Sequence, residues 1–303
     1  MGETKKFKSG FVSLVGRTNV GKSTLLNSLA KEKIAITTNK TQTTRTAIKA
    51  IITNENHQII ITDTPGIHKP KTKLGETMIE TAFSMITEVD CILFLIEATS
   101  TEIGRGDSRI LEKIKEAGKP CILVINKIDL VNKEELAKII ALYNKEYNFT
   151  AVVPISAYKS KGTEELLEEI EKLLPYGPKY YDEEEYTDQT SRQLVEELIR
   201  EKALKFLNEE VPHGIYVEVE EFKFRQTSKK EDIYDIEATI YCLRESHKGI
   251  IIGKGGAMLK RISTYARQDA ENMLGTKVNL KVWVKVKEDW QEKDNIVNKF
   301  KLK

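Results

Sequence analysis

The sequence predicts an α/β domain with a mostly parallel sheet covered by helices on both faces, followed by a smaller α+β domain. Near-continuous apolar runs alternate with segments of helical periodicity up to about Leu174, which is the pattern of parallel strands between helices. The composition then shifts at a Pro- and Gly-containing stretch followed by an acidic run. We expect the first domain at 7–176, a linker at 177–188 and the second domain at 189–303.

Length, charge and cysteine usage limit the function classes. A chain of 303 residues has room for about two domains, and its net charge of +2 excludes a general affinity for polyanions. The cysteines Cys91, Cys121 and Cys242 lie far apart and mostly in apolar runs, which indicates buried thiols in a reducing compartment. The charged N-terminus has no apolar segment and the apolar runs are far shorter than a membrane span, so we expect a cytoplasmic protein.

A glycine-rich loop follows the apolar run Phe11 to Val15 and opens a helical pattern. Gly16 and Gly21 let backbone N–H groups point at phosphate oxygens, Lys22 supplies a positive charge, and Ser23 offers a hydroxyl to Mg²⁺. A glycine turn beside a solvated lysine is the alternative, and the strand before and helix after the loop favour phosphate binding. The predicted binding residues here are Gly16, Arg17, Thr18, Asn19, Val20, Gly21, Lys22, Ser23 and Thr24.

The next segment, Ile34 to Thr46, is rich in Thr and Asn and has no helical period, so we expect a mobile loop. Two strand-like runs follow, Ala47 to Thr53 and His57 to Thr62, joined by a hairpin-like turn. The second run ends in Asp63-Thr64-Pro65-Gly66. We expect two strand-pairing ladders of the sheet between this run and the strand that leads into the phosphate loop. From there Asp63 can hold Mg²⁺ through water while the Gly66 amide reaches a terminal phosphate.

Further strands and helices alternate, and two strand ends carry base-recognition residues. Asn126-Lys127-Ile128-Asp129 ends the strand from Cys121, where Asp129 can accept both N1–H and N2–H₂ of guanine. Ser156 and Ala157 end the strand from Ala151, where a backbone N–H can meet the guanine carbonyl. The predicted base site therefore comprises Asn126, Lys127, Asp129, Ser156 and Ala157.

The second domain begins with a helix that Thr187 or Asp188 caps, followed by the strand-like runs Ile215 to Phe224 and Ile233 to Leu243. A final strand is expected at Val278 to Val286. Trp283 and Trp290 are candidate stacking platforms for bases, although the alternating pattern around Trp283 favours the core.

Between these strands, a Gly-x-x-Gly turn separates two helices. Such a turn brings protein backbone close to a nucleic-acid backbone, and an ordinary helix connection is the alternative. The cations around it are Arg244, Lys248, Lys254, Lys260, Arg261 and Arg267, with Glu245 as the only acidic residue between the first and the last of them. The predicted RNA-binding residues are Gly253, Lys254, Gly255, Gly256, Lys260 and Arg261.

These motifs together resemble known families. The four strand-end motifs from Phe7 to about Leu174 resemble a translation-factor-class P-loop GTPase domain, and the second domain resembles the type II KH fold. Arg17-x-Asn19 and Gln42-Thr43-Thr44-Arg45 resemble the Era family of bacterial ribosome-assembly GTPases. The sequence departs from the family at Thr18, where Pro is usual. Ile67 replaces the Gln with which Ras-like proteins orient the attacking water, which implies slow unaided hydrolysis or help from another group.

The resemblance implies Mg²⁺-dependent hydrolysis of GTP to GDP, with Lys22, Thr44 and Gly66 as catalytic residues. It places Ser23, Thr44 and Asp63 around Mg²⁺, with Thr43 as the nearby alternative to Thr44. We further predict that Asn19 helps to hold K⁺. The resemblance also implies binding of single-stranded 16S ribosomal RNA near its 3′ end, action in 30S subunit assembly, and peripheral association with the inner face of the cell membrane. We expect a monomer.

Two alternatives stay open. The chain could be a tRNA-modification or signalling GTPase whose C-terminal domain binds protein. It could also be an RNA-binding module with a degenerate nucleotide fold, against which the intact Lys22, Ser23, Asp63 and Asp129 argue.

Overall fold

The computed structural model describes residues 6–38, 40, 43–66, 70, 72–228 and 230–300. Gln42 and Ile67, on which two of the predictions above depend, lie outside the described residues. The chain divides into two compact units. Unit 1 consists of Met1–Ala35, Thr41–Asp188 and Phe300–Lys303, and unit 2 of Ile36–Lys40 and Gln189–Lys299.

Unit 1 contains a sheet of six strands in the order β2-β3-β1-β4-β5-β6. The strands are β1 (Lys8–Val15), β2 (Ile48–Thr53), β3 (His57–Asp63), β4 (Cys91–Glu97), β5 (Cys121–Asn126) and β6 (Ala151–Pro154). All neighbours are parallel except β2 and β3, which form an antiparallel hairpin. Strand β3 lies directly beside β1, with Leu14 opposite Asp63, so the prediction of two ladders between them was wrong. The phosphate loop and Asp63 therefore lie at the ends of two adjacent strands.

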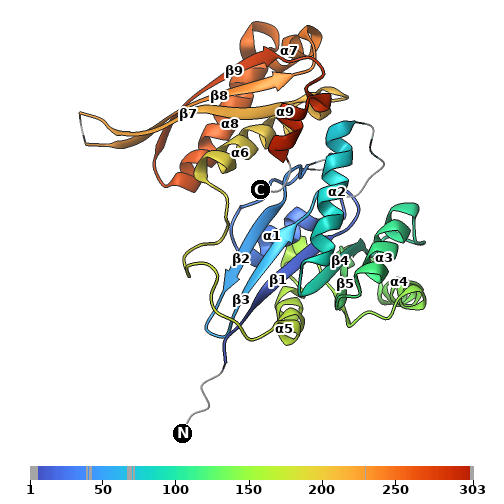
Figure 1. The fold of residues 1–303 in the computed structure, drawn as a ribbon. Helices are drawn as coiled ribbons and strands as arrows, with labels where there is room; N and C mark the ends of the chain where they lie inside the picture. Colours follow the sequence, from blue (N-terminus) through green and yellow to red (C-terminus); the bar gives the residue numbers. More distant parts are fainter. Residues whose placement is uncertain are drawn as a thin grey trace. The chain divides into compact units, whose positions relative to one another are not determined.

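Helices cover both faces of this sheet (Figure 1). The helices are α1 (Lys22–Ala30), α2 (Lys73–Thr87), α3 (Arg105–Ala117), α4 (Lys133–Glu146) and α5 (Thr163–Leu173). Leu25 of α1 and Leu166 of α5 share one core with Leu14, whereas Ile110 of α3 packs with Phe94 in the other. The central strands are buried on both faces, which explains their near-continuous apolar runs and confirms the predicted α/β fold.

The predicted linker, residues 177–188, belongs to unit 1 and lies against the β2–β3 hairpin. The backbone N–H of Ile51 in β2 donates to the Tyr186 carbonyl at 3.0 Å. The side-chain oxygen of Gln58, which is fully buried in β3, accepts from the Tyr180 N–H at 2.7 Å. These bonds give the outer edge of β2 a partial partner.

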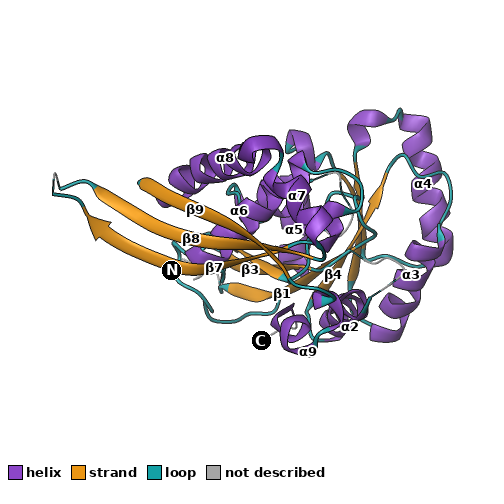
Figure 2. Ribbon diagram, turned by 90° about the horizontal axis from the view of Figure 1, so that it is seen from above, coloured by secondary structure: helices purple, strands orange, loops and turns teal. Residues whose placement is uncertain are grey.

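Unit 2 has the element order of a type II KH domain, as predicted. Its main elements are α6 (Ser191–Phe206), β7 (Tyr216–Gln226), β8 (Asp232–Cys242), α7 (Glu245–Ile252), α8 (Ala257–Leu274), β9 (Lys277–Val286) and α9 (Asp294–Val297). Strands β7 and β8 are antiparallel, β8 and β9 are parallel, and α6 and α8 pack against this three-stranded sheet (Figure 2). Thr190 and Gln193 form a capping box at the start of α6, so the predicted cap at Thr187 or Asp188 was wrong.

The two tryptophans lie in environments opposite to those predicted. Trp283 on β9 is 53% exposed, so the core assignment was wrong. Trp290 is fully buried and donates its Nε1–H to the Gly214 carbonyl at 2.9 Å, which excludes it as a stacking platform. The three cysteines are buried free thiols, as predicted.

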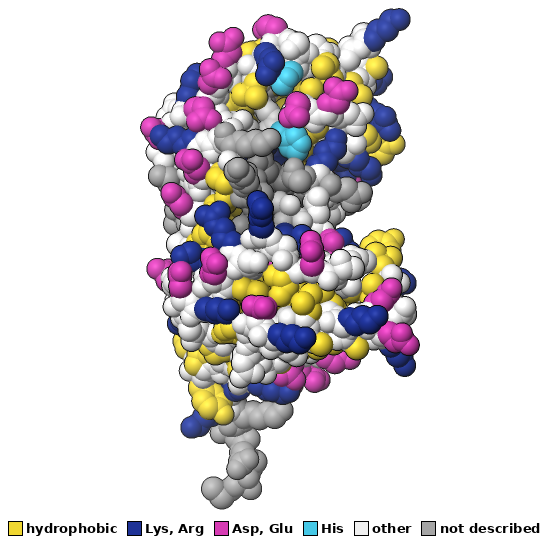
Figure 3. Space-filling view, turned by 90° about the vertical axis from the view of Figure 1, so that its right-hand side faces the viewer, with side chains coloured by type: hydrophobic (Ala, Val, Ile, Leu, Met, Phe, Trp, Pro, Cys, Tyr) yellow, Lys and Arg dark blue, Asp and Glu magenta, His cyan; other side chains and the backbone are white. Residues whose placement is uncertain are grey.

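Surface charges of both signs are interspersed on the face of the molecule in Figure 3, in keeping with the small net charge of +2. Within the described part of the chain, no helix combines the length and apolar character needed to cross a membrane.

Candidate nucleotide and nucleic-acid sites

Glycines stand at both ends of the phosphate loop because the backbone there passes close to other strands. A Cβ added to Gly16 would lie 2.5 Å from the carbonyl oxygen of Leu95 in β4. Gly21 has a φ of 102°, and a Cβ there would overlap the Asn126 side chain. Helix α1 begins at the next residue, so its N-terminal amides face the loop and favour an anion there.

Lys22 lies across the phosphate loop. Its Nζ donates to the carbonyl oxygens of Gly16 at 3.1 Å and of Arg17 at 3.0 Å. Burial lowers the pKa of Lys22, and the neighbouring carboxylate of Asp63 raises it. The structure thus holds the Lys22 side chain, with a buried carboxylate in its neighbourhood, at the place where phosphates would enter.

Three residues predicted to surround Mg²⁺ meet at the end of β3. Ser23 Oγ donates to Asp63 Oδ2 at 2.8 Å, Thr44 Oγ1 donates to the same oxygen at 3.2 Å, and the two hydroxyl oxygens are 2.9 Å apart. Burial raises the pKa of Asp63, while Lys22 and the two hydroxyls lower it. Asp63 Oδ1 is buried and has no hydrogen-bond partner among the described residues. This set of hard oxygen donors fits the ligand preference of Mg²⁺.

Gly66 lies close to the phosphate loop in space. A Cβ added to Gly66 would lie 2.8 Å from Thr18 Cγ2 and 3.2 Å from Lys22 Nζ. The close approach leaves no room for a side chain at Gly66 and places its backbone next to the lysine. It also locates Thr18, the departure from the family pattern, on the side of the loop that faces Gly66.

The predicted base-binding loops are hydrogen-bonded to the phosphate loop. Asn126 is buried, and its Nδ2 donates to the Val20 carbonyl at 2.8 Å. Its Oδ1 accepts from the Ala157 N–H at 2.9 Å. Lys127 Nζ donates to the Asn19 carbonyl at 3.1 Å. Asn126 and Lys127 therefore align the base loops with the phosphate loop, a role that the motif alone did not specify.

Asp129 lies beside these loops, and its side chain is 19% exposed. Ser156 Oγ donates to Asp129 Oδ1 at 2.7 Å, and Lys159 Nζ lies 3.8 Å from Oδ2. The Ser156 hydroxyl is the main cause that lowers the pKa of Asp129. The carboxylate is thus oriented and kept ionised, which is the state that accepts hydrogen bonds.

Sequence reasoning missed two acidic residues of this site. Glu97 at the end of β4 forms an ion pair with Lys127. Asp107 on α3 is fully buried and pairs with Arg17 of the phosphate loop at 2.9 Å. A carboxylate at the end of an apolar strand was an available signal for Glu97. For Asp107 the sequence offered none, because the residue lies in an ordinary polar helix start.

In unit 2 the predicted clamp residues lie on the turn between α7 and α8. Gly253, Gly255 and Gly256 have φ values of 74°, 59° and 79°, a backbone that side chains rarely allow. A Cβ at Gly255 or Gly256 would meet nothing within 4 Å, so open space lies above the turn. Lys254 is exposed beside it, and Lys260 on the first turns of α8 is exposed as well.

The predicted cationic frame is smaller than the sequence indicated. Arg267 pairs with Glu271 at 2.6 Å, and Glu271 stands just beyond the window in which acidic residues were counted. The Arg261 guanidinium lies 4.1 Å from the centre of the Phe206 ring. Lys248 lies 3.7 Å from Glu245. Within the described ranges, Arg244, Lys254 and Lys260 are exposed and in no ion pair, so they are the cations most available to a polyanion.

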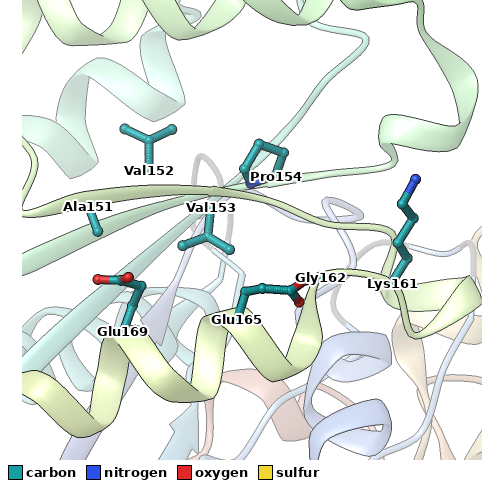
Figure 4. Close-up of a pocket in the computed structure, with 8 residues that line it drawn as sticks. All are labelled: Ala151, Val152, Val153, Pro154, Lys161, Gly162, Glu165 and Glu169. Atoms are coloured by element: carbon teal, nitrogen blue, oxygen red, sulfur yellow. The ribbon is translucent and has the colours of Figure 1, made fainter.

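A separate groove of 370 Å³ runs beside the edge strand β6 (Figure 4). Glu165 and Glu169 extend from α5 toward the strand in this view. Its lining residues are Ala151, Val152, Val153, Pro154, Lys161, Gly162, Glu165 and Glu169. None of them is a predicted site residue, so the groove is distinct from the nucleotide site.

Fold and site together define a P-loop GTPase domain joined to a KH domain. Comparison with protein families agrees with this class. Residues 11–127 match the family described as 50S ribosome-binding GTPase, and residues 210–291 match the KH domain family.

Comparison with individual proteins gives the family. The chain is 53% identical to GTPase Era of Caldanaerobacter subterraneus subsp. tengcongensis, over 97% of both chains. It is 52% identical to GTPase Era of Clostridioides difficile, over 97% of this chain and 98% of the relative. The chain therefore belongs to the Era family of GTPases.

Two solved structures are similar over nearly the whole chain. One is Era in complex with MgGDPNP and nucleotides 1506–1542 of 16S ribosomal RNA, with a TM-score of 0.92, 41% identity, and coverage of 97% of this chain and 98% of that one. The other is a variant of Aquifex aeolicus Era bound to GDP and AlF₄⁻, with a TM-score of 0.91, 41% identity, and coverage of 97% and 99%.

Proposed function

We propose that this GTPase binds GTP with Mg²⁺ through the residues gathered at the ends of β1, β3, β5 and β6, and that its KH domain binds single-stranded 16S ribosomal RNA near the 3′ end during assembly of the 30S subunit. The convergence of Ser23, Thr44 and Asp63, with hydroxyl and carboxylate oxygens within 3.2 Å of one another, is the observation that carries the nucleotide part. The similar complex of Era with 16S RNA nucleotides supports the RNA part.

In this proposal the phosphates lie on the loop amides and the α1 N-terminus. Lys22 would exchange its bonds to loop carbonyls for phosphate oxygens, which it can reach without leaving the loop. Ser23, Thr44 and Asp63 would hold Mg²⁺, which neutralises charge on the phosphates as hydrolysis proceeds. Gly66 would donate its backbone N–H to the terminal phosphate.

Asp129 would select guanine. Its carboxylate, oriented by Ser156, can accept both hydrogen bonds from the guanine edge, whereas adenine offers no such pair of donors. The backbone N–H of Ala157 bonds to Asn126 at 2.9 Å, which holds the loop after β6 beside the base site.

The clamp of the KH domain would bind the RNA backbone. The turn offers backbone amides and open space at Gly255 and Gly256, and Lys254 and Lys260 supply positive charge. Contacts of this kind bind phosphates without reading sequence, so the bases must be recognised on neighbouring surfaces of the same domain.

The test of the RNA site is the double variant Lys254→Asp/Gly255→Asp. We expect it to bind single-stranded RNA much more weakly and with a shallower salt dependence, because fewer phosphate contacts release fewer counterions. GTP affinity and intrinsic hydrolysis should be unchanged. Lys230→Asp, at an exposed position in the loop between β7 and β8, is the control with the same lysine change.

A folded double variant with wild-type RNA affinity and salt dependence would contradict the clamp and favour a protein-binding C-terminal domain. The 30S subunit as partner, K⁺ at Asn19 and peripheral association with the membrane remain predictions from the family resemblance and the loop sequence.

A further inference from the structure

The side chain of Arg17 leaves the phosphate loop and lies on α3. Its Nε is 2.9 Å from Asp107 Oδ2, and its Nη2 donates to Ser100 Oγ at 3.2 Å. The Arg17 side chain is 34% exposed, whereas that of Asp107 has no exposure. A surface arginine of the loop is thus joined to a carboxylate inside the domain.

Asp107 is held from a second side as well. Tyr143 of α4, also fully buried, donates its hydroxyl to Asp107 Oδ2 at 2.9 Å. Burial raises the pKa of Asp107, and the nearby Arg17 guanidinium lowers it. A carboxylate with this burial needs its cation, since removal of one partner from a buried pair leaves an uncompensated charge. Helices α3 and α4 therefore both contribute to the anchor of one loop residue.

Helix α3 also leaves space for the stem of this arginine. A Cβ added to Gly106 would lie 2.9 Å from Arg17 Cδ and 3.0 Å from Cγ. Gly106 occupies the first turn of α3, where another residue would normally be a better helix former. The arginine stem fills the volume that a side chain at this position would take.

The backbone of the same residue is held from the other direction, because the Arg17 carbonyl accepts a bond from Lys22 Nζ at 3.0 Å. We propose that Asp107 is a positioning residue for nucleotide binding, which acts through Arg17 to fix the phosphate loop in its receiving conformation before the nucleotide arrives. A loop ordered in advance loses less backbone entropy on binding, so the anchor raises nucleotide affinity without touching the ligand.

The experiment measures the Kd of Mg–GDP by fluorescence titration of the full chain. Asp107→Asn should weaken binding about tenfold, because it removes the buried charge with which Arg17 is paired. Arg17→Ala should weaken it at least as much. Because Asp107 acts through Arg17, the double variant should bind no more weakly than Arg17→Ala. Glu112→Gln, at an exposed position on α3, is the matched control and should keep the wild-type Kd.

Thermal unfolding without nucleotide separates positioning from a general loss of structure. Arg17→Ala leaves a buried carboxylate without its cation, so the added Asp107→Asn change should raise the melting temperature of that variant while leaving its Kd unchanged. A purely structural role predicts that Kd and melting temperature move together. A wild-type Kd for Asp107→Asn, or additive losses in the double variant, would overturn the proposal.

Gly106→Ala provides the test if Asp107→Asn does not fold. Alanine displaces the arginine stem without changing any charge, so it should weaken Mg–GDP binding in the wild-type background. The same change should have no effect on the Kd in the Arg17→Ala background, where the stem is absent. An equal loss of affinity in both backgrounds would refute the role of Arg17 as the link.

Discussion

Replacement of Asn126 by alanine tests whether the loops of the nucleotide site are held by one side chain. Asn126 sits at the end of β5 with 3% exposure and bonds the phosphate loop at Val20 to the β6 loop at Ala157. Alanine removes both hydrogen bonds and leaves the Val20 carbonyl and the Ala157 N–H buried without their partner. We therefore expect unit 1 to lose stability and nucleotide affinity together.

The magnitude follows from the two orphaned groups. Each buried polar group without a partner costs about 1–3 kcal/mol, so two cost about 2–6 kcal/mol. Water that enters the space of the side chain recovers part of this, which puts the expected loss at about 3 kcal/mol. For a domain of this size, about 2–4 °C is lost per kcal/mol, so the unit 1 transition should fall by about 6–12 °C.

Differential scanning calorimetry of the full chain without nucleotide measures the shift. Asn144→Ala is the matched control, because it makes the same chemical change at an exposed position on α4, away from the site. Its transition should stay within about 1–2 °C of the wild type. If Asn126→Ala melts with this control and binds GDP like the wild type, the two hydrogen bonds do not hold the loops together and the reasoning fails.

Three further predictions concern base choice, monovalent ions and pH. Asp129→Asn should lower GTP affinity at least about a hundredfold and permit xanthosine triphosphate, which competition binding measures; an unchanged preference for GTP would contradict the assignment. K⁺ should accelerate hydrolysis relative to Na⁺, and Asn19→Ala should remove the difference, whereas equal rates in both salts would exclude the ion site. Burial raises the pKa of Glu196 to about 7 from its usual 4.5, so the folded state retains a proton and the free energy of unfolding falls as pH rises between these values. Glu196→Gln should remove this fall of about 3 kcal/mol, which urea denaturation at pH 5 and pH 8 measures. Glu288→Gln is the control and should keep the fall. An equal pH dependence in both variants would refute the role of Glu196.

Much of the chemistry could be inferred from the sequence because it depends on short stretches of backbone. A loop that presents amides to phosphate needs glycines at set positions, and the turn before Lys22 therefore has a recognisable pattern. The same holds for the carboxylate of Asp129 after a buried strand and for the glycine turn around Lys254. In each case the binding chemistry itself requires certain residue types within a few positions of one another, so the sequence shows them directly.

The sequence also determined the class of fold. Apolar strands between amphipathic helices can bury their side chains only in a covered parallel sheet, and the change of element order after Leu174 indicated a second domain. The exact start of a helix could not be predicted as well, because several neighbouring residues can act as its N-cap. Thr190 caps α6 because Gln193 stands three residues later and completes the capping box, which Thr187 and Asp188 could not do.

Only the tertiary structure decided how distant segments meet. The sequence contains no sign that Asp107 anchors Arg17, because the pair depends on how α3 packs beside the phosphate loop. The exposure of Trp283 could have been read from the sequence, because alternation along β9 puts this residue on the same face as Lys281 and Lys285, and the core assignment overlooked that period. The burial of Trp290, by contrast, depends on how its segment packs against Gly214. Contacts between residues far apart in the sequence depend on how whole helices and strands pack. Local sequence patterns therefore identify the residues that would contact the nucleotide, whereas only the fold shows which other residues hold them in place.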